Sequence, residues 1–373
     1  MTHSATRIAI ESAAPVPPPA GAICVVVGTR PEVVKLAPVV DELRLRDARL
    51  DVLVTGQHTT LLSGMPSLGL TRELRLASRG HVAEYVTRAR RALHGDFMRH
   101  KPSVVVVQGD TMSAFAAALA AADAGVRVAH VEAGVRSGNE REPWPEESIR
   151  REIDALATWR YAPTAHALAN LRREGLRGMV TGNTVVDALQ HYTDAYPRPE
   201  ASPTILVTLH RREFYTRADA GGVLDALVEG ARLHLGVTFV WPVHPALREL
   251  AKVALRDAPP NLVPTDPMPY MALANALADA RGVLTDSGGV TEEAATLGVP
   301  TVVLRRVTDR PEAVEAGIAV LLAPEPDLAL LAVRVLAAQS IPPIPSVIYG
   351  DGHAARRIVT HLTNALRARS VGA

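Results

Sequence analysis

The sequence is poor in several features, and each shortage argues against a class of protein. It has one cysteine, Cys24, so an internal disulfide is impossible, and the paired-cysteine and H-E-x-x-H metal signatures are absent. No apolar run approaches the roughly 20 residues of a membrane helix. The first residues do not show a basic segment followed by a hydrophobic stretch, so we expect no secretory signal here. Forty basic and 39 acidic residues leave a net charge of +1, which does not favour binding to nucleic acid or to a membrane surface. We therefore expect a cytoplasmic protein whose chemistry demands no metal or cofactor.

The chain is long enough and apolar enough to form two cores. It has 373 residues, of which 47% are hydrophobic but only 4% aromatic. A single core seldom grows to that length, so two domains are expected. Their interiors should consist mainly of Ala, Val and Leu, with Cys24 buried in the strand-like run A-I-C-V-V-V.

Short β-branched runs alternate with longer Ala- and Leu-rich segments, which is typical of βαβ units around a parallel sheet. Strands are expected at 22–27, 50–54, 103–107 and 126–131, and again at 204–208, 237–243, 281–286 and 300–304. Helices are expected at 32–46, 82–99, 112–124 and 354–366. The sequence thus predicts an α/β fold with two Rossmann-like domains facing a cleft.

The same pattern suggests domain limits. Residues 1–20 end in A-A-P-V-P-P-P-A and are expected to form a disordered tail. The first domain should span 21–190 and the second, nucleotide-binding domain 204–350, with a proline-containing linker between them. Residues 351–373 carry the last, amphipathic helix.

Three carboxylates stand near the ends of predicted structure. Asp110 closes V-V-V-V-Q-G-D, Glu132 follows V-R-V-A-H-V, and Glu146 lies in P-W-P-E-E. Ligands of open α/β sheets bind at the carboxyl ends of the strands. Because acids held close together cannot all ionise cheaply, at least one should have a raised pKa. The pattern indicates acid/base chemistry.

Two basic turns follow predicted strands. The turn G-T-R-P-E opens a helix whose first backbone N–H groups, with Arg30 and Lys35, are suited to a phosphate. The turn L-H-R-R-E places His210 and two arginines where they can neutralise a pyrophosphate and donate a proton. Both turns are equally compatible with ordinary solvated basic residues.

A third turn, T-D-S-G-G-V-T-E-E, favours nucleotide binding more strongly. Ser287 and Gly288 can form a backbone cradle for phosphate, and Glu292 or Glu293 can accept hydrogen bonds from ribose. Ordinary helix capping is the alternative. His244 in W-P-V-H-P suits a site residue or a turn histidine equally well.

Several residues near the carboxylates have less specific interpretations. Arg150 follows Glu146 at helical spacing, so it should pair with that acid or reach a phosphate. We expect His130 to be structural. Trp144, between two prolines, is expected to anchor the loop that carries Glu146.

Read together, the motifs form an ordered set: G-T-R-P-E-x-x-K, T-G-Q-H, Q-G-D-T, H-V-E-A-G-x-R, P-W-P-E-E-x-x-R, T-G-N-T-V-x-D-A-L, H-R-R-E, P-V-H, T-D-S-G-G-x-x-E-E, R-P-E-A-V-E-A-G and Y-G-D-G. This set resembles the UDP-N-acetylglucosamine 2-epimerase family, of the non-hydrolysing type, over nearly the whole chain. The resemblance implies the two-domain GT-B type of fold, in which the last helix crosses back to pack on the first domain.

The resemblance also implies a reaction. The family reversibly inverts C2 of the sugar, converting UDP-GlcNAc to UDP-ManNAc by eliminating UDP to a 2-acetamidoglucal and adding it back. By motif match, the catalytic residues would be Asp110, Glu132, Glu146 and His210. Proton transfer at C2 is assigned to Glu132 and Asp110, and the leaving phosphate to His210. The nucleotide sugar would be held by Arg30, Lys35, Arg150, His244, Ser287, Gly288, Glu293 and Arg310.

Other functions remain open at this stage. A hydrolysing 2-epimerase would release UDP and free ManNAc, while a GT-B glycosyltransferase would share the D-S-G-G turn but have no need of H-V-E-A-G and P-W-P-E-E. A sensor that binds without turnover is a further alternative. A UDP-sugar and a second copy of the chain, in a homodimer, are the partners we expect.

The chain also departs from the family pattern. Leu209 and Phe214 flank H-R-R-E where the family has glycine and a small polar residue, which leaves room for an altered sugar. Thr59 and Thr60 follow T-G-Q-H, and 61–80 is shortened near the family's second, activating UDP-GlcNAc site. Allosteric activation is therefore an open question.

Overall fold

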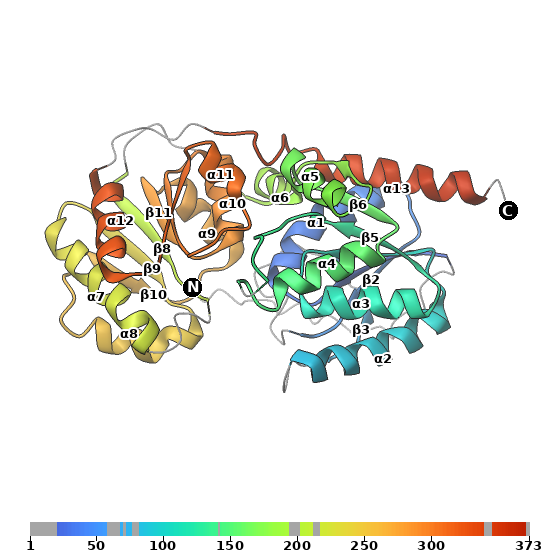
Figure 1. Cartoon of the computed structure of the whole chain (residues 1–373), viewed down its shortest axis with the longest axis horizontal. Coiled ribbons are helices and arrows are strands. Elements are labelled where there is room, and N and C mark those ends of the chain that lie inside the picture. Colours follow the sequence, from blue (N-terminus) through green and yellow to red (C-terminus); the bar gives the residue numbers. More distant parts are fainter. Residues whose placement is uncertain are drawn as a thin grey trace, which may run out of the picture.

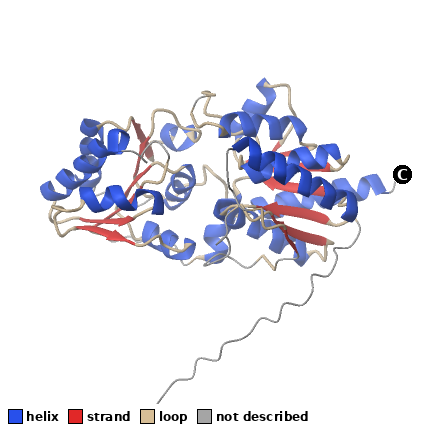
Figure 2. Cartoon of the chain, turned by 90° about the horizontal axis from the view of Figure 1, so that it is seen from below, coloured by secondary structure: helices blue, strands red, loops and turns tan. Residues whose placement is uncertain are grey.

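The chain forms two parallel β-sheets, each covered by helices on both faces (Figure 1). The computed structural model describes residues 21–57, 68–69, 72–76, 82–140, 142–193, 202–211, 217–338 and 345–370. Seen from below, the two sheets lie in separate halves of the molecule (Figure 2). The predicted α/β class with two Rossmann-like domains is confirmed.

All strand pairs in both sheets are parallel. The first sheet has the order β3-β2-β1-β4-β5-β6-β7 and the second β10-β9-β8-β11-β12-β13. The strands of the first are β1 Ile23–Val27, β2 Leu50–Val54, β3 Arg72–Glu73, β4 Val104–Gln108, β5 Arg127–Val131, β6 Trp159–Ala162 and β7 Met179–Val180. Those of the second are β8 Thr204–Thr208, β9 Thr238–Pro242, β10 Leu262–Thr265, β11 Gly282–Thr285, β12 Thr301–Leu304 and β13 Ala319–Leu322.

Alternation along the central strands divides the first core into two layers. In β1, Val25 and Val27 join the core on the face of helix α1, whereas Cys24 and Val26 join the core on the opposite face. This two-residue period is the geometry of a strand buried on both faces. The helices of this half are α1 Arg30–Leu45, α2 Val82–His100, α3 Met112–Asp123, α4 Glu146–Leu156, α5 Ala165–Arg173 and α6 Thr184–Tyr192.

The second sheet is enclosed in the same way. One face packs against α7 Arg217–Leu233, α8 Arg248–Ala254 and α12 Pro326–Ala338, and the other against α9 Tyr270–Ala278, α10 Gly288–Leu297 and α11 Pro311–Glu315. A short 3-10 helix, Pro245–Leu247, precedes α8. Trp241 fills this core with 1% of its surface exposed, one of the few aromatic side chains available to do so.

The last helix, α13 Ala354–Ser370, returns to the first half of the molecule, as expected (Figure 1). Its buried residues Ile358, Val359 and Leu362 belong to the same core as α1 and β1. The backbone N–H groups of Ala354 and Ala355 donate to Asp187 of α6, which fixes the start of the helix. The domain limits 21–190, 204–350 and 351–373 remain predictions.

Both sheets have a point where the strand order reverses. In the first it lies between β1 and β4, and in the second between β8 and β11. Crevices at the carboxyl ends of such strands are the usual ligand sites of open α/β sheets. The segments that follow these four strands carry Arg30, Asp110, His210 and Ser287, so these four predicted site residues lie at the two reversal points.

Some predictions fall on other parts of the chain. The tail 1–20, most of 58–80, and Phe214 lie outside the described residues. Leu209 is described, and its side chain is buried in the core of the second sheet, where it occupies protein interior. Among the described helices, none combines the length and apolarity needed to cross a membrane.

Candidate functional site

The three predicted carboxylates come from neighbouring elements of the first domain. Asp110 follows β4 and Glu132 follows β5, while Glu146 is the first residue of α4. Glu132 has a φ of 69°, in the left-handed region that residues other than glycine seldom occupy. Such backbone strain persists where surrounding contacts enforce it, and it clusters at functional sites.

Cationic and amide groups surround Glu132. Its Oε2 accepts from Lys35 Nζ at 2.5 Å and from Gln108 Nε2 at 3.1 Å, and its Oε1 accepts from Arg310 Nη2 at 2.7 Å. Burial works against its ionisation, but the charges of Lys35 and Arg310 outweigh that effect and lower the pKa of Glu132. Glu132 is therefore an ionised carboxylate at neutral pH.

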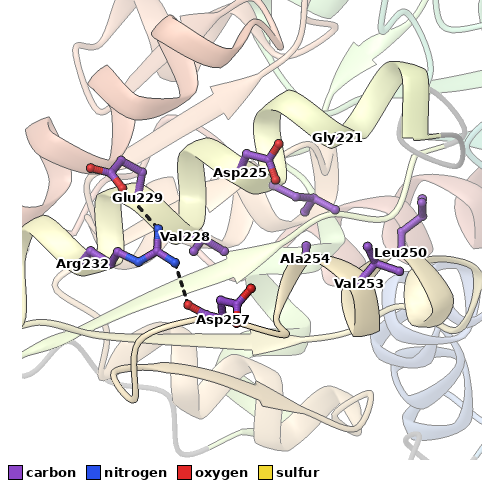
Figure 3. A pocket seen from close by; sticks show the side chains of 10 residues that line it. Gly221, Asp225, Val228, Glu229, Arg232, Leu250, Val253, Ala254 and Asp257 are labelled. Atoms are coloured by element: carbon purple, nitrogen blue, oxygen red, sulfur yellow. Dashed lines mark hydrogen bonds and ion pairs between the residues drawn. The ribbon is translucent and has the colours of Figure 1, made fainter.

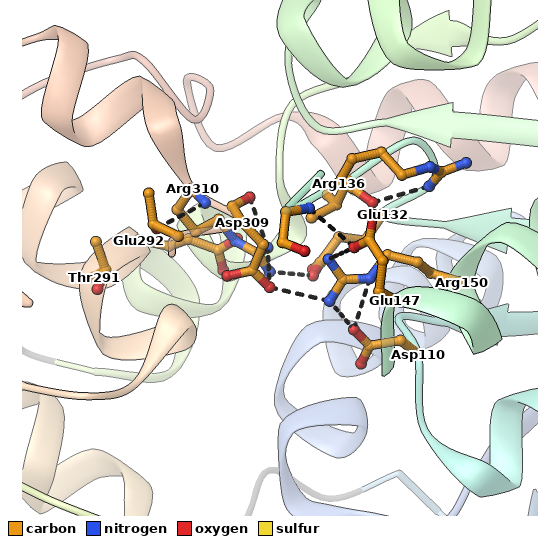
Figure 4. Close-up of polar contacts among 12 residues, drawn as sticks. Asp110, Glu132, Arg136, Glu147, Arg150, Thr291, Glu292, Asp309 and Arg310 are labelled. Carbon is orange, nitrogen blue, oxygen red and sulfur yellow. Dashed lines mark hydrogen bonds and ion pairs between the residues drawn. The ribbon is translucent and has the colours of Figure 1, made fainter. Parts of the chain in front are cut away.

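The same two cations join the domains. Figure 4 shows Arg310 and Glu292 of the second domain beside Glu132 of the first. Lys35, from α1, also donates to Glu292 Oε2 of α10 at 2.8 Å, and Arg310 donates through Nε to the other oxygen of Glu292. Glu292 is completely buried. Two cations and two carboxylates, one of each from each domain, thus form a closed ion-pair network.

Arg150 makes a second bridge between the domains (Figure 4). It donates to Asp110 through Nε at 3.0 Å and also through Nη2, and the same Nη2 lies 3.0 Å from Asp309 Oδ2 of the second domain. Its Nη1 reaches Glu147 Oε2 at 3.3 Å. Arg150 therefore pairs with Glu147 and Asp110 of its own domain, and not with Glu146, the partner that helical spacing suggested.

Glu146 occupies a different environment from Glu132. Its Oε2 is buried with no hydrogen-bond partner. Burial raises the pKa of Glu146, and the negative charge of nearby Asp110 raises it further, with Arg211 and Arg150 offsetting only part of the effect. The raised pKa that the sequence predicted for at least one acid is found on Glu146.

The basic turn of the second domain places His210 beside the buried carboxylate of Asp286. His210 Nδ1 lies 2.6 Å from Asp286 Oδ1, and its ring centroid lies 6.2 Å from that of His244. Burial lowers the pKa of His244, and the charge on His210 acts in the same direction. The structure therefore brings the two predicted histidines together at the ends of the neighbouring strands β8 and β9.

The turn before α10 carries the predicted phosphate-binding residues Ser287 and Gly288. Ser287 caps the helix, with Oγ 3.4 Å from the N–H of Val290, so the capping interpretation holds for this side chain. A Cβ added at Gly288 would meet no atom closer than Asp309 Oδ1 at 3.6 Å, which is ordinary contact. The packing of protein atoms therefore does not by itself require glycine at this position. Burial raises the pKa of Glu293, one turn further on, to about 8.

The turn before α1 differs from the expectation. Glu32 Oε2 accepts the backbone N–H of Gly28 at 3.0 Å and of Thr29 at 2.7 Å, while Oε1 accepts from Thr111 Oγ1 at 2.8 Å. The two N–H groups just before the helix are thus bound by an internal carboxylate, and phosphate binding at this turn remains a prediction for the helix N-terminus, Arg30 and Lys35. Arg30 is half-buried as the first residue of α1.

Comparison of the sequence with known proteins shows which family the chain resembles. The profile of the family described as UDP-N-acetylglucosamine 2-epimerase matches residues 41–363. The UDP-N-acetylglucosamine 2-epimerase of Bacillus subtilis is 37% identical, covering 91% of this chain and 94% of that protein. The chain belongs to the UDP-N-acetylglucosamine 2-epimerase family.

Solved structures agree with this assignment. The Neisseria meningitidis UDP-GlcNAc 2-epimerase bound to UDP-GlcNAc has a TM-score of 0.81 and 31% identity, covering 92% of this chain and 99% of that one. The Methanocaldococcus jannaschii UDP-GlcNAc 2-epimerase in complex with UDP-GlcNAc and UDP has a TM-score of 0.81 and 29% identity, over the same shares of the two chains. The GT-B type of fold implied by the motifs is that of the family.

Five residues of this epimerase that contact the predicted site residues, or the turns that carry them, were not identified from the sequence. They are Glu32, Gln108, Glu147, Asp286 and Asp309, all of which contact predicted site residues or the turns that carry them. Each lies inside or beside a family motif, which was the available signal. Trp144, in contrast, is 63% exposed and does not anchor its loop in a core.

A cavity of about 450 Å³ lies elsewhere, between α7 and α8 (Figure 3). Its lining includes Asp225, Glu229, Val253 and Asp257, and it contains none of the predicted site residues. Across the described part of the chain, no group of three or more His, Cys, Asp or Glu side chains is placed to hold a metal ion.

Proposed function

We propose that this family member reversibly interconverts UDP-GlcNAc and UDP-ManNAc. A base removes the C2 proton as the C1–oxygen bond to UDP breaks, which gives the 2-acetamidoglucal. A proton then adds to C2 from the opposite face as a UDP oxygen re-forms the bond to C1. The route needs an ionised acid and a protonated acid in one site.

The opposite pKa shifts of Glu132 and Glu146 carry this proposal. Lys35 and Arg310 hold Glu132 ionised, whereas burial and Asp110 favour the protonated form of Glu146. Acid and base assignments follow where neighbouring carboxyl groups are driven apart in pKa. Glu132, with Asp110, would therefore exchange the C2 proton on one face, and Glu146 would supply it on the other.

The second domain would hold the nucleotide. Ser287, Gly288 and the N-terminus of α10 suit the diphosphate, and Glu293 suits the ribose. His210 and His244 stand at the neighbouring strand ends, where His210 would protonate the leaving phosphate. Lys35, Arg150 and Arg310 are already paired with carboxylates. Their main role would be to set the charge of the acids and to hold the domains together.

Product analysis tests the proposal. UDP-GlcNAc is incubated with the protein, and the mixture is separated by anion-exchange chromatography and identified by NMR. UDP-ManNAc at equilibrium with UDP-GlcNAc is the expected result. Free ManNAc with UDP would indicate the hydrolysing reaction instead, and unchanged UDP-GlcNAc would overturn both.

We further propose that the chain acts in the cytoplasm as a homodimer. Light scattering coupled to size-exclusion chromatography should give twice the 39.7 kDa chain mass. A mass of one chain at the concentration used for turnover would contradict the dimer.

A further inference from the structure

Asp286 contacts both the ring and the backbone of His210. It follows β11, next to the end of β8, and no part of its side chain is exposed. Its Oδ2 accepts the backbone N–H groups of His210 at 2.8 Å and Arg211 at 2.9 Å, while Oδ1 lies 2.6 Å from His210 Nδ1. One carboxylate therefore holds the turn through two hydrogen bonds and lies within ion-pair distance of the imidazole.

The charge of Asp286 suits this arrangement. Burial opposes its ionisation, but the contact with His210 and the two backbone N–H groups outweigh burial and lower its pKa. An ionised carboxylate has no proton to donate, and its charge favours a proton on the ring nitrogen that faces it, Nδ1, at 2.6 Å. The partner of one ring nitrogen thereby determines the state of the other.

We propose that Asp286 is a positioning residue for the reaction: it keeps a proton on Nδ1 of His210 and favours the doubly protonated imidazole, whose Nε2 proton is then donated to the leaving phosphate. The inference rests on the proposed function, since it names a further residue of the same site. Asp286 acts through His210 and does not itself contact the substrate.

The Asp286→Asn variant separates positioning from structure. An asparagine oxygen can still accept the two backbone N–H groups, so the turn is retained. Its NH₂ group then faces Nδ1 of His210 as a donor, which selects the opposite tautomer. Oriented acid–base groups typically contribute about 10²- to 10⁴-fold to rate. We expect kcat to fall at least ~10²-fold and KM to change by less than ~3-fold, the signature of an interaction used in the transition state.

A double-mutant cycle with His210→Asn provides the decisive comparison. If Asp286 acts through His210, adding Asp286→Asn to the His210→Asn variant should lower kcat by less than about 3-fold, because coupled residues are strongly non-additive. A full loss in that background would overturn the proposal. Asp327→Asn, on the exposed start of α12, is the control and should leave kcat unchanged.

Nitrogen-15 NMR of His210 tests the proposal independently of turnover. The wild-type ring should be protonated at Nδ1, and Asp286→Asn should shift the proton to Nε2 in the neutral ring. A wild-type ring protonated only at Nε2 would refute the positioning role even in an active enzyme. If wild-type protein binds UDP but converts no UDP-GlcNAc, the proposed function fails while the ring assignment can still be read.

Discussion

Removal of the charge on Asp309 should destabilise the protein more than removal of an exposed carboxylate. Asp309 is 7% exposed, and its oxygens lie 2.7 Å from Arg305, 3.0 Å from Arg150 and 3.2 Å from Arg310. Burial opposes its ionisation, but these arginines lower its pKa well below the usual range. Asp309→Asn would leave three buried guanidinium groups without this charge.

The expected loss of unfolding free energy follows from the burial of Asp309. Loss of one partner from a buried ion pair typically costs about 3–5 kcal/mol. An exposed pair contributes about 0.2–1 kcal/mol. Asp351 supplies the matched control, because it pairs with Arg357 at 2.6 Å while its side chain is 48% exposed. We therefore expect the free energy of unfolding to fall by about 3 kcal/mol or more in Asp309→Asn, and by less than about 1 kcal/mol in Asp351→Asn.

Urea denaturation at pH 7, followed by far-UV circular dichroism, measures both variants. Equal midpoints for the two variants would refute the reasoning. The pH dependence gives a second check. Because the folded-state pKa of Asp309 is lowered, its stabilisation is present above its ordinary pKa of 3.8 and is lost as the pH falls below that value. The difference between wild type and Asp309→Asn should shrink in acid.

Three further predictions concern the glutamates of the site. Burial raises the folded-state pKa of Glu293 from 4.5 to about 8, so its contribution to stability is present below pH 4.5 and is lost as the pH rises toward 8. Glu293→Gln should therefore lose less stability than wild type between pH 5 and pH 8 in denaturation experiments. An equal loss in the two proteins would contradict this prediction. Glu132→Gln should abolish exchange of the C2 proton but preserve UDP binding by calorimetry, whereas wild-type exchange would remove its assigned role. Glu146→Gln lacks the acidic proton, so kcat should fall by about 10²- to 10⁴-fold; an unchanged kcat would exclude Glu146 as the donor.

Most of the fold was predictable because its signals are local. Val-rich runs such as 104–107 and 23–27 became central strands, and the proline at the start of α1 occupies a helix N-terminus, as expected. The carboxyl-end rule for parallel strands then placed Asp110 and Glu132 at one rim without knowledge of any contact.

The partners of the site residues were harder to predict because they are distant in sequence. Lys35 and Glu292 are 257 positions apart, and no periodicity reports that α1 and α10 meet across the domains. Helical spacing suggested Glu146 as a partner of Arg150. The guanidinium instead contacts Asp110, which follows strand β4. The basic turn at Gly28 does lie between a strand and a helix, but its N–H groups donate to an internal carboxylate, Glu32.

The exposed Trp144 shows a related limit. An aromatic side chain between two prolines predicts a buried anchor, but it is mostly exposed to solvent. The choice between burial and exposure depends on whether neighbouring elements supply a cavity, which the local sequence does not encode.

The central claim concerns the C2 proton, and one measurement tests it most directly. UDP-GlcNAc is incubated with the wild-type protein in heavy water, and the recovered UDP-GlcNAc is examined by proton NMR. Reversible elimination and re-addition predicts loss of the C2 proton signal as deuterium enters the intact nucleotide sugar. A fully retained C2 proton, in a protein that binds UDP, would contradict the account.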